Sequence, residues 1–140
     1  MPVAEIEFVE RWLYSTLAGD PLLAQVGIYS SLAPPSAVYP LVIYAPLAPA
    51  DVFGNGPERI FVRGEWKIVA VGRTPSYRPL VPLADRIDTL LHNSSFFAAT
   101  GAVFACVRIE PFALVEQGEQ GVVYRQLGGI YRIWTKEYRQ

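Results

Sequence analysis

The first 19 residues carry apolar side chains at intervals of three and four, the period of a helix with one buried face. The apolar positions are Val3, Ile6, Val9, Leu13 and Leu17. The charged residues Glu5, Glu7, Glu10 and Arg11 fall on the other side of the predicted helix. Gly19 is expected to end it, and Asp20-Pro21 then predicts the N-cap and first turn of a short helix over 22–26.

A second amphipathic helix is predicted over residues 78–92. Its apolar stripe consists of Leu80, Leu83, Ala84, Ile87, Leu90 and Leu91. Pro79 and Pro82 are compatible with this helix because they fall near its first turn, where no backbone donor is required. The polar run 93–95 is expected to close it.

The segment 59–72 alternates with period two, which predicts a strand with one core face and one solvent face. Even positions are apolar or glycine, whereas Arg63, Glu65 and Lys67 occupy odd positions. Gly64 suggests a bulge or bend within this strand. The other predicted strands are 28–32, 41–47, 103–109 (ended by Pro111, with 112–116 continuing in extended form) and a strand pair or bent strand over 122–138 with a kink at Gly128-Gly129. Turn formers predict a loop over 49–58 and a turn over 117–121.

The order of these elements predicts one α+β domain over residues 1–140. Its sheet is expected to be mostly antiparallel or mixed, flanked by two main helices. The composition agrees, because 140 residues with 51% hydrophobic and 18% charged positions build a single buried core rather than a disordered segment. No linker, repeat or low-complexity tract divides the chain.

Residues 21–50 contain no charged side chain, which is long enough for a membrane span, but six prolines are spread through the segment. A bilayer requires every backbone polar group to be paired, so these prolines argue against a spanning helix. The acidic start of the chain is unlike a signal peptide, and we expect no membrane association. The free thiol fits a reducing compartment.

Candidate chemistry is sparse, and the sequence predicts neither an enzyme nor a cofactor or metal site. His92 and Cys106 are the only histidine and the only cysteine. His92 is interpreted as a residue at a helix end, and Cys106 as a small core or interface residue. Asp85 and Asp88 share one turn of a solvated helix, and 54–56 resembles a phosphate-binding loop only weakly, because neither a lysine nor a helix follows.

Charge is unevenly distributed, although the formal net charge is −1. Residues 1–20 hold four acids and one base, 59–78 hold five bases and one acid, and 122–140 hold four bases and one acid. Such segregation favours head-to-tail association between copies; the alternatives are ordinary solvated faces and a basic surface lining a channel for DNA. An aromatic set exceeds what a small sheet and two helices readily cover, which also favours an interface: Tyr39, Tyr44, Phe53, Phe61, Tyr77, Tyr131 and Trp134.

Nine short segments, taken in their order along the chain, carry a resemblance to a known family. They are 20–23, 27–29, 39–44, 51–54, 57–59, 66–68, 83–87, 123–125 and 128–132. In this order the chain resembles the tail terminator (tail-completion) proteins of long-tailed, siphovirus-type bacteriophages.

That resemblance implies a structural virion protein that forms a ring, expected to be a hexamer. The ring would cap the tail tube, end its polymerisation and join the tail to the head-side connector, or stopper, protein. DNA would pass through the lumen without sequence-specific binding. The protein would be assembled in the host cytoplasm and reside in the neck of the virion, at the top of the tail.

Two groups of residues are candidates for these contacts. Contact with a neighbouring subunit or the tube is assigned to Asp51, Phe53, Asn55, Glu58 and Arg59. Arg63 and Lys67, on the solvent face of their strand, are assigned to the lumen or an interface. Two alternatives remain: another head-tail connector or head-completion protein, and a small-ligand-binding domain or minor enzyme with a pocket between sheet and helices.

Overall fold

The computed structural model describes residues 3–53 and 59–138. The helices are α1 (Val3–Ala18), the 3-10 turns η1 (Leu23–Gln25), η2 (Arg78–Leu80) and η3 (Glu119–Gly121), and α2 (Val81–Leu91). The strands are β1 (Gly27–Ser30), β2 (Leu41–Phe53), β3 (Arg59–Gly72), β4 (Ser94–Ala98), β5 (Gly101–Gln117) and β6 (Val123–Glu137). Within the described residues they form one mixed six-stranded sheet in the order β1-β2-β3-β6-β5-β4, in which only β1 and β2 pair in parallel. The predicted α+β fold is therefore confirmed.

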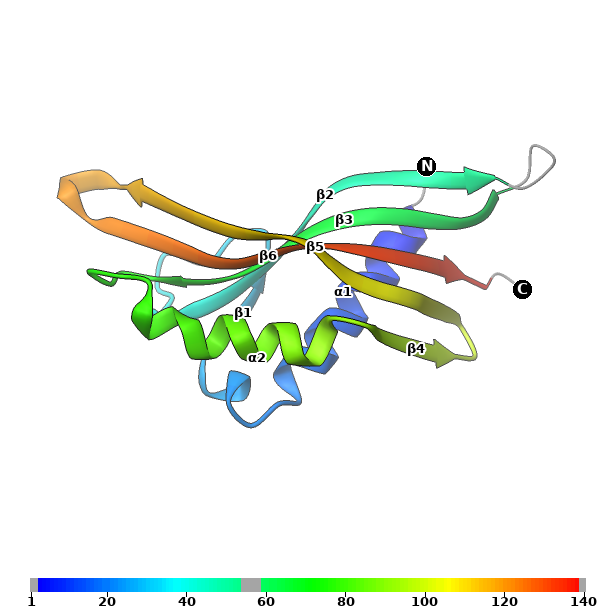
Figure 1. Ribbon diagram of the computed structural model, residues 1–140, viewed down its shortest axis with the longest axis horizontal. Coiled ribbons are helices and arrows are strands. Elements are labelled where there is room, and N and C mark those ends of the chain that lie inside the picture. Colours follow the sequence, from blue (N-terminus) through cyan, green and yellow to red (C-terminus); the bar gives the residue numbers. More distant parts are fainter. Residues whose placement is uncertain (1–2, 54–58, 139–140) are drawn as a thin grey trace.

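Both helices pack on the same face of the sheet, which we call the helix-bearing face. The sheet curls over them (Figure 1), and one core cluster joins Leu13 of α1 and Ile87 of α2 to Trp66, Ile68 and Ile133 of the strands. The opposite side, the open face, carries a smaller cluster at one end, where residues 31–40 cover Leu41, Val69 and Val71. The apolar stripes predicted from the sequence thus face one shared core.

The connection between α1 and β1 is fixed by Asp20. Its Oδ2 accepts hydrogen bonds from the backbone N–H of Leu22 and Leu23, so Asp20 holds the start of this segment. The helix predicted over 22–26 is only the 3-10 turn η1, and its N-cap position is Leu22 rather than Asp20. Its Oδ1 lies 2.6 Å from the Arg86 guanidinium of α2. The hydrogen bond from Arg86 lowers the pKa of the Asp20 carboxyl and ties the two helices together.

Strand β3 has the bounds that the alternation predicted, but Gly64 is not the site of a bulge. Residues Val62, Gly64, Trp66, Ile68 and Ala70 are buried on the helix-bearing face, as expected. Gly64 pairs regularly with Pro49 and Ile133, and the register shift falls at Leu47 of β2, which is left without a partner. The extra residue bends β2 at this point, and a second register shift, between Val52 and Phe53, leaves Ile60 near the start of β3 without a partner.

Two predicted strand ends are wrong. Strand β2 continues to Phe53, so residues 49–53 are extended rather than part of a loop, and 54–58 lie outside the described residues. Pro111 does not end β5, which continues to Gln117. Beyond Cys106, β5 pairs only with β6, so the proline sits on an edge where no second neighbour requires its missing N–H.

The sequence also missed one strand. Residues 93–95 were expected only to close the second helix, yet Ser94 begins β4, which pairs antiparallel with the start of β5. Strand β4 is short and lies at the edge of the sheet. Its only large apolar side chains are those of Phe96 and Phe97, which are too few to show an alternating pattern in the sequence. Phe96 faces Phe8 of α1 with ring centroids 6.3 Å apart.

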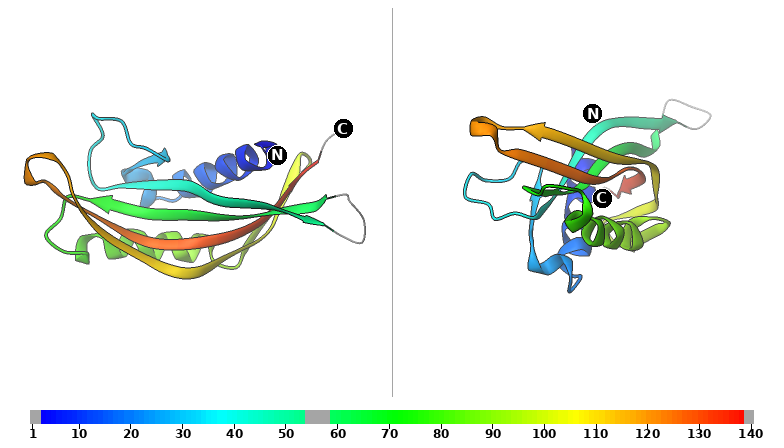
Figure 2. Two further views of the ribbon diagram at one scale, coloured as in Figure 1. Left: turned by 90° about the horizontal axis from the view of Figure 1, so that it is seen from above. Right: turned by 60° about the vertical axis from the view of Figure 1, so that its left-hand side comes forward.

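Residues 123–137 form one long strand, β6, rather than a pair of strands. With β5 it builds a hairpin that projects beyond the helices, and we call its outer part, residues 109–125, the arm. Figure 2 shows the arm and the β2–β3 hairpin at opposite ends of the sheet. At Gly128, the backbone of β6 lies so close to β3 that an added Cβ would sit 2.2 Å from the Ile68 carbonyl oxygen.

Three side chains lie deeper than the sequence indicated. Glu5, predicted on the polar side of α1, is only 7% exposed, and its Oε2 has no hydrogen-bond partner among the described residues. It shares a helical row with Val9 and Trp12, so the buried face of α1 is wider than the apolar stripe alone. Tyr44 and Tyr131, expected among the surplus aromatics, are core residues.

In the described part of the chain no helix is long and apolar enough to cross a membrane.

Candidate assembly surface

The residues proposed for a subunit or tube contact do not all share one surface. Asp51 pairs with the buried Val62 and therefore lies on the helix-bearing side, half-buried. Phe53 and Arg59 are paired across the end of the β2–β3 hairpin, and nothing is described of their side chains. Asn55 and Glu58 lie outside the described residues.

Arg63 and Lys67 do lie on the open face, as the alternation predicted, but in different settings. Arg63 is exposed. Lys67 is half-buried; its Nζ donates to Gln126 Oε1 at 3.2 Å and lies 5.3 Å from the centroid of the Phe112 ring. Lys67 is therefore tied to the base of the arm, whereas Arg63 presents its charge to the surroundings.

Side-chain hydrogen bonds and ion pairs hold the middle of the open face. Gln126 Nε2 donates to Glu116 Oε1 at 3.2 Å, which extends the contact from Lys67 into the arm. At the next position of β3 on this face after Lys67, Glu65 Oε1 lies 2.7 Å from Arg132 Nη2 of β6. Both pairs join neighbouring strands, so they fix the register of β3, β6 and β5 beside the arm.

A group of three phenylalanines, the half-buried Phe61 and the exposed Phe97 and Phe104, lies on the open face at the end opposite the arm. Phe61 and Phe104 have ring centroids 6.0 Å apart, and Phe97 and Phe104 6.2 Å apart, with edge-on geometry in both pairs. Phe97 is 65% and Phe104 40% exposed. We call Phe61, Phe97 and Phe104 the aromatic patch. An apolar cluster of this kind on a surface is typical of a protein interface.

Only Phe61 of this patch was singled out from the sequence. Phe97 was missed because β4 was missed, and Phe104 because it is the extra residue of a register shift in β5 between Val103 and Ala105. A bulge moves a side chain out of strict alternation. The adjacent Phe96-Phe97 pair was the available signal, since neighbouring strand residues face opposite sides.

A group of polar contacts joins the end of α2 to β5 and β6. The Tyr131 hydroxyl donates to Asp88 Oδ1 at 2.9 Å, and burial raises the pKa of this phenol. Arg108 Nε lies 3.5 Å from the same oxygen of Asp88. His92 Nδ1 accepts a hydrogen bond from the Arg108 backbone N–H, 3.0 Å away, which joins the end of α2 to β5. Among the described residues, no group of three or more His, Cys, Asp or Glu side chains is placed to hold a metal ion.

Cys106 is fully buried in the core, as its apolar surroundings predicted. Burial raises the pKa of its thiol to about 12, which leaves almost no thiolate near neutral pH. We expect the folded protein to resist alkylation by iodoacetamide at pH 8 and the urea-unfolded protein to react fully, as measured by mass spectrometry. Rapid labelling of the folded protein would contradict this placement of Cys106.

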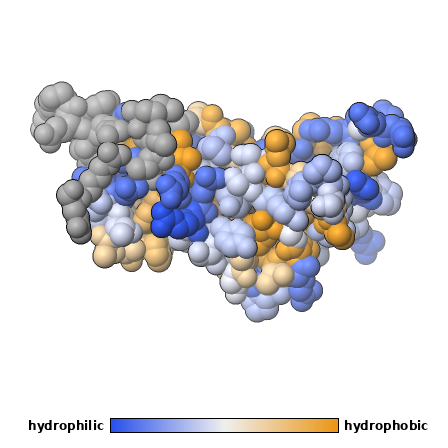
Figure 3. All heavy atoms as spheres, turned by 180° about the vertical axis from the view of Figure 1, so that it is seen from behind, coloured by the Kyte–Doolittle hydropathy of each residue, from blue (hydrophilic) through white to orange (hydrophobic). Residues whose placement is uncertain are grey.

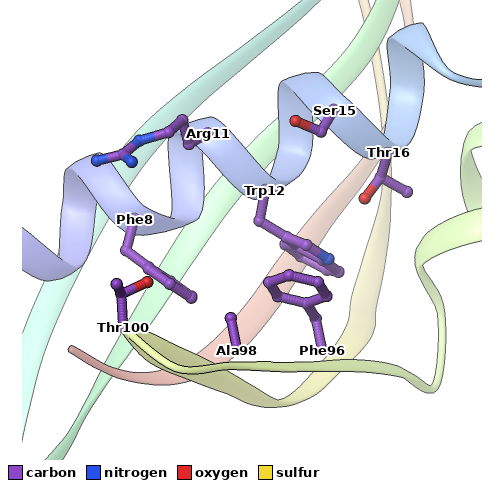
Figure 4. Close-up of a pocket in the computed structure, with 8 residues that line it drawn as sticks. All are labelled: Phe8, Arg11, Trp12, Ser15, Thr16, Phe96, Ala98 and Thr100. Atoms are coloured by element: carbon purple, nitrogen blue, oxygen red, sulfur yellow. The ribbon is translucent and has the colours of Figure 1, made fainter. Parts of the chain in front are cut away.

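A pocket of about 320 Å³ lies between α1 and β4 (Figure 4). Figure 4 shows the rings of Phe8, Trp12 and Phe96 turned toward one another, with Arg11 at the rim. The remaining lining residues are Ser15, Thr16, Ala98 and Thr100. Arg11 is exposed and forms an ion pair with Glu7 at 2.8 Å. The three aromatic rings therefore give the pocket mainly apolar contacts for a ligand.

Comparison with known proteins identifies one solved structure with the same fold. No family model matches this chain, and no curated protein matches it by sequence. The chain is similar to a chain of the solved structure described as "Virion of native gene transfer agent (GTA) particle". The TM-score is 0.63 at 12% identity, over 90% of this chain and 92% of that chain. The two chains therefore share one fold along nearly their full lengths.

Proposed function

We propose that this protein is a structural component of a phage-like virion, a tail terminator that forms a ring on the end of the tail tube. The observation that carries the proposal is the shared fold with a chain of a virion particle. The order of sequence segments resembling tail terminators supports it independently. In this role the ring ends tube polymerisation, contacts the head-side connector and encloses the passage for DNA.

The surface of the chain is suited to contacts between proteins. Exposed phenylalanines gather on the open face, and the exposed acids of the arm lie at the opposite end of the sheet from the exposed bases Arg63 and Lys136. A ring requires two different, complementary surfaces on each copy, because its contacts are heterologous. We assign Arg63 to such a contact. We also place the end of the β2–β3 hairpin, with Asp51, Phe53 and Arg59, against the neighbouring subunit or the tube, together with residues 54–58.

The test has two parts. Size-exclusion chromatography with light scattering is expected to show a closed oligomer, with a hexamer as the expected species. Electron microscopy of the protein mixed with purified tail tubes is expected to show a ring at one tube end and tubes of fixed length. Binding to the head-side connector but not to tubes would instead identify another head-tail connector protein.

The pocket between α1 and β4 is the observation that favours a second candidate, a small-ligand-binding domain. Its volume lies in the range of small-molecule sites and its floor is aromatic. The same chromatography separates the two candidates. A protein that remains monomeric at high concentration and ignores tail tubes would contradict the ring and favour the pocket.

A further inference from the structure

The arm carries acidic and apolar side chains that extend past the body of the protein. The arm, residues 109–125, contains three acids, Glu110, Glu116 and Glu119, and one base, Arg125, whose guanidinium donates a hydrogen bond to the Thr74 carbonyl oxygen. All three acids are exposed. Apolar side chains accompany them: Leu114 is 37%, Val115 49% and Val123 37% exposed. In Figure 3 this end of the molecule lies at the right and is largely hydrophilic, with apolar side chains between.

The aromatic patch at the other end of the sheet has the complementary character. Strand register places two bases beside it. Phe97 pairs with Ala102, which pairs in turn with Lys136, so these residues form one row across the sheet. Arg63 follows Phe61 on the same face of β3, and both Arg63 and Lys136 are exposed. Glu65, the next acid on this face, is already paired with Arg132.

We propose that the arm of one copy docks on the aromatic patch of the next copy, with Glu116 and Glu119 facing Arg63 and Lys136. This inference rests on the proposed ring and names its subunit contact. The arm and the patch lie at opposite ends of one sheet, so a copy does not join its own two surfaces. Each copy therefore gives its arm to one neighbour and receives the arm of the other. This contact is heterologous, the kind from which a ring forms when the rotation between copies closes.

Packing of side chains, rather than continuation of the sheet, makes this contact. Two long strand edges have no neighbour in the described sheet: β2 beyond Tyr44 and β5 beyond Cys106. Prolines interrupt both edges, at Pro46 and Pro49 in β2 and at Pro111 in β5. Proline has no N–H to donate to an added strand, and edge prolines are a known obstacle to sheet extension. The apolar side chains and charges of the arm and patch are then the groups that bind.

Charge exchange tests the pairing. The patch variant is Arg63→Glu with Lys136→Glu, and the arm variant is Glu116→Lys with Glu119→Lys. Each variant alone places like charges in contact, so we expect roughly hundredfold weaker association in light scattering. An equimolar mixture of the two variants contains two complementary contacts, arm variant on patch variant and the reverse. We expect the mixture, and also a single chain carrying all four substitutions, to assemble like the wild type.

A matched control separates this contact from net charge. Glu7→Lys with Asp85→Lys makes the same charge change as the arm variant, at exposed positions of α1 and α2. We expect this control to assemble normally, and circular dichroism and urea unfolding to show all variants folded. Assembly lost equally in the control would overturn the proposal.

The remaining outcomes distinguish the contact from the function. Rings formed by both single-surface variants, or a mixture that stays dissociated, would overturn the arm–patch contact and leave the terminator ring intact. Patch-variant rings that no longer bind tail tubes would assign the patch to the tube and also overturn the contact. A wild-type protein that is monomeric throughout would overturn both proposals.

Discussion

Gly128→Ala is expected to cost about 4 kcal/mol or more of the free energy of unfolding, among the largest effects of any single substitution. The added Cβ would lie 2.2 Å from the Ile68 carbonyl oxygen and 2.7 Å from the Val69 Cα. Both are backbone atoms of β3, so no side chain rotates to relieve the clash. The two strands must separate where β6 leads into the arm.

The neighbouring glycine provides the control. In Gly129→Ala, the new Cβ would meet the Arg108 side chain, with Cδ at 2.6 Å, and the Glu110 carbonyl oxygen at 3.2 Å. A flexible side chain moves at low cost, so we expect a loss of about 1 kcal/mol. Urea unfolding followed by tryptophan fluorescence compares the two variants. Equal destabilisation would show that the close approach of β3 and β6 is not the cause.

Leu13→Ala is expected to destabilise the protein by about 3–5 kcal/mol, because it leaves a cavity where α1 packs on the sheet. Leu13 is fully buried in the main core cluster. The adjacent Tyr14 is 51% exposed, so Tyr14→Ala is expected to cost less than about 1 kcal/mol.

Thermal unfolding by calorimetry measures both variants. The melting temperature should fall by about 10 °C or more for Leu13→Ala and by at most a few degrees for Tyr14→Ala. A reversed order would mean that α1 is rotated about its axis relative to the described packing. That rotation would also remove Phe8 and Trp12 from the pocket beside β4.

The period of apolar residues correctly predicted those helices and strands that bury one side and expose the other. β3 and the two main helices have apolar positions on one side, and their residues occupy the expected places in the core. The short strand β4 carries too few residues to show a period, so it was missed together with Phe97. Proline rules suggested an end at Pro111 because sequence alone does not reveal that this part of β5 is an edge.

The candidate site was predicted in part. Arg63 and Lys67 were assigned to the open face correctly, because alternation in β3 fixes the side to which each residue points. The sequence did not show that Lys67 is held by Gln126, 59 positions away. It also assigned Asp51, with Phe53, Asn55, Glu58 and Arg59, to one contact near the open-face pair Arg63 and Lys67, because all of these residues are close in sequence. The register shift at Leu47 and the pairing of β2 with β3 place Asp51 on the opposite side.

Local pattern alone determined that this chain has two amphipathic helices, a central alternating strand, a turn held by Asp20 and a core thiol at Cys106. These properties depend on neighbours within a few residues, which the sequence displays directly. Strand order, bulges and the meeting of β3, β4 and β5 were decided only in three dimensions, because they depend on which distant backbones pair. The aromatic patch and the arm belong to this second kind, since each is assembled from residues on strands that pair across the sheet.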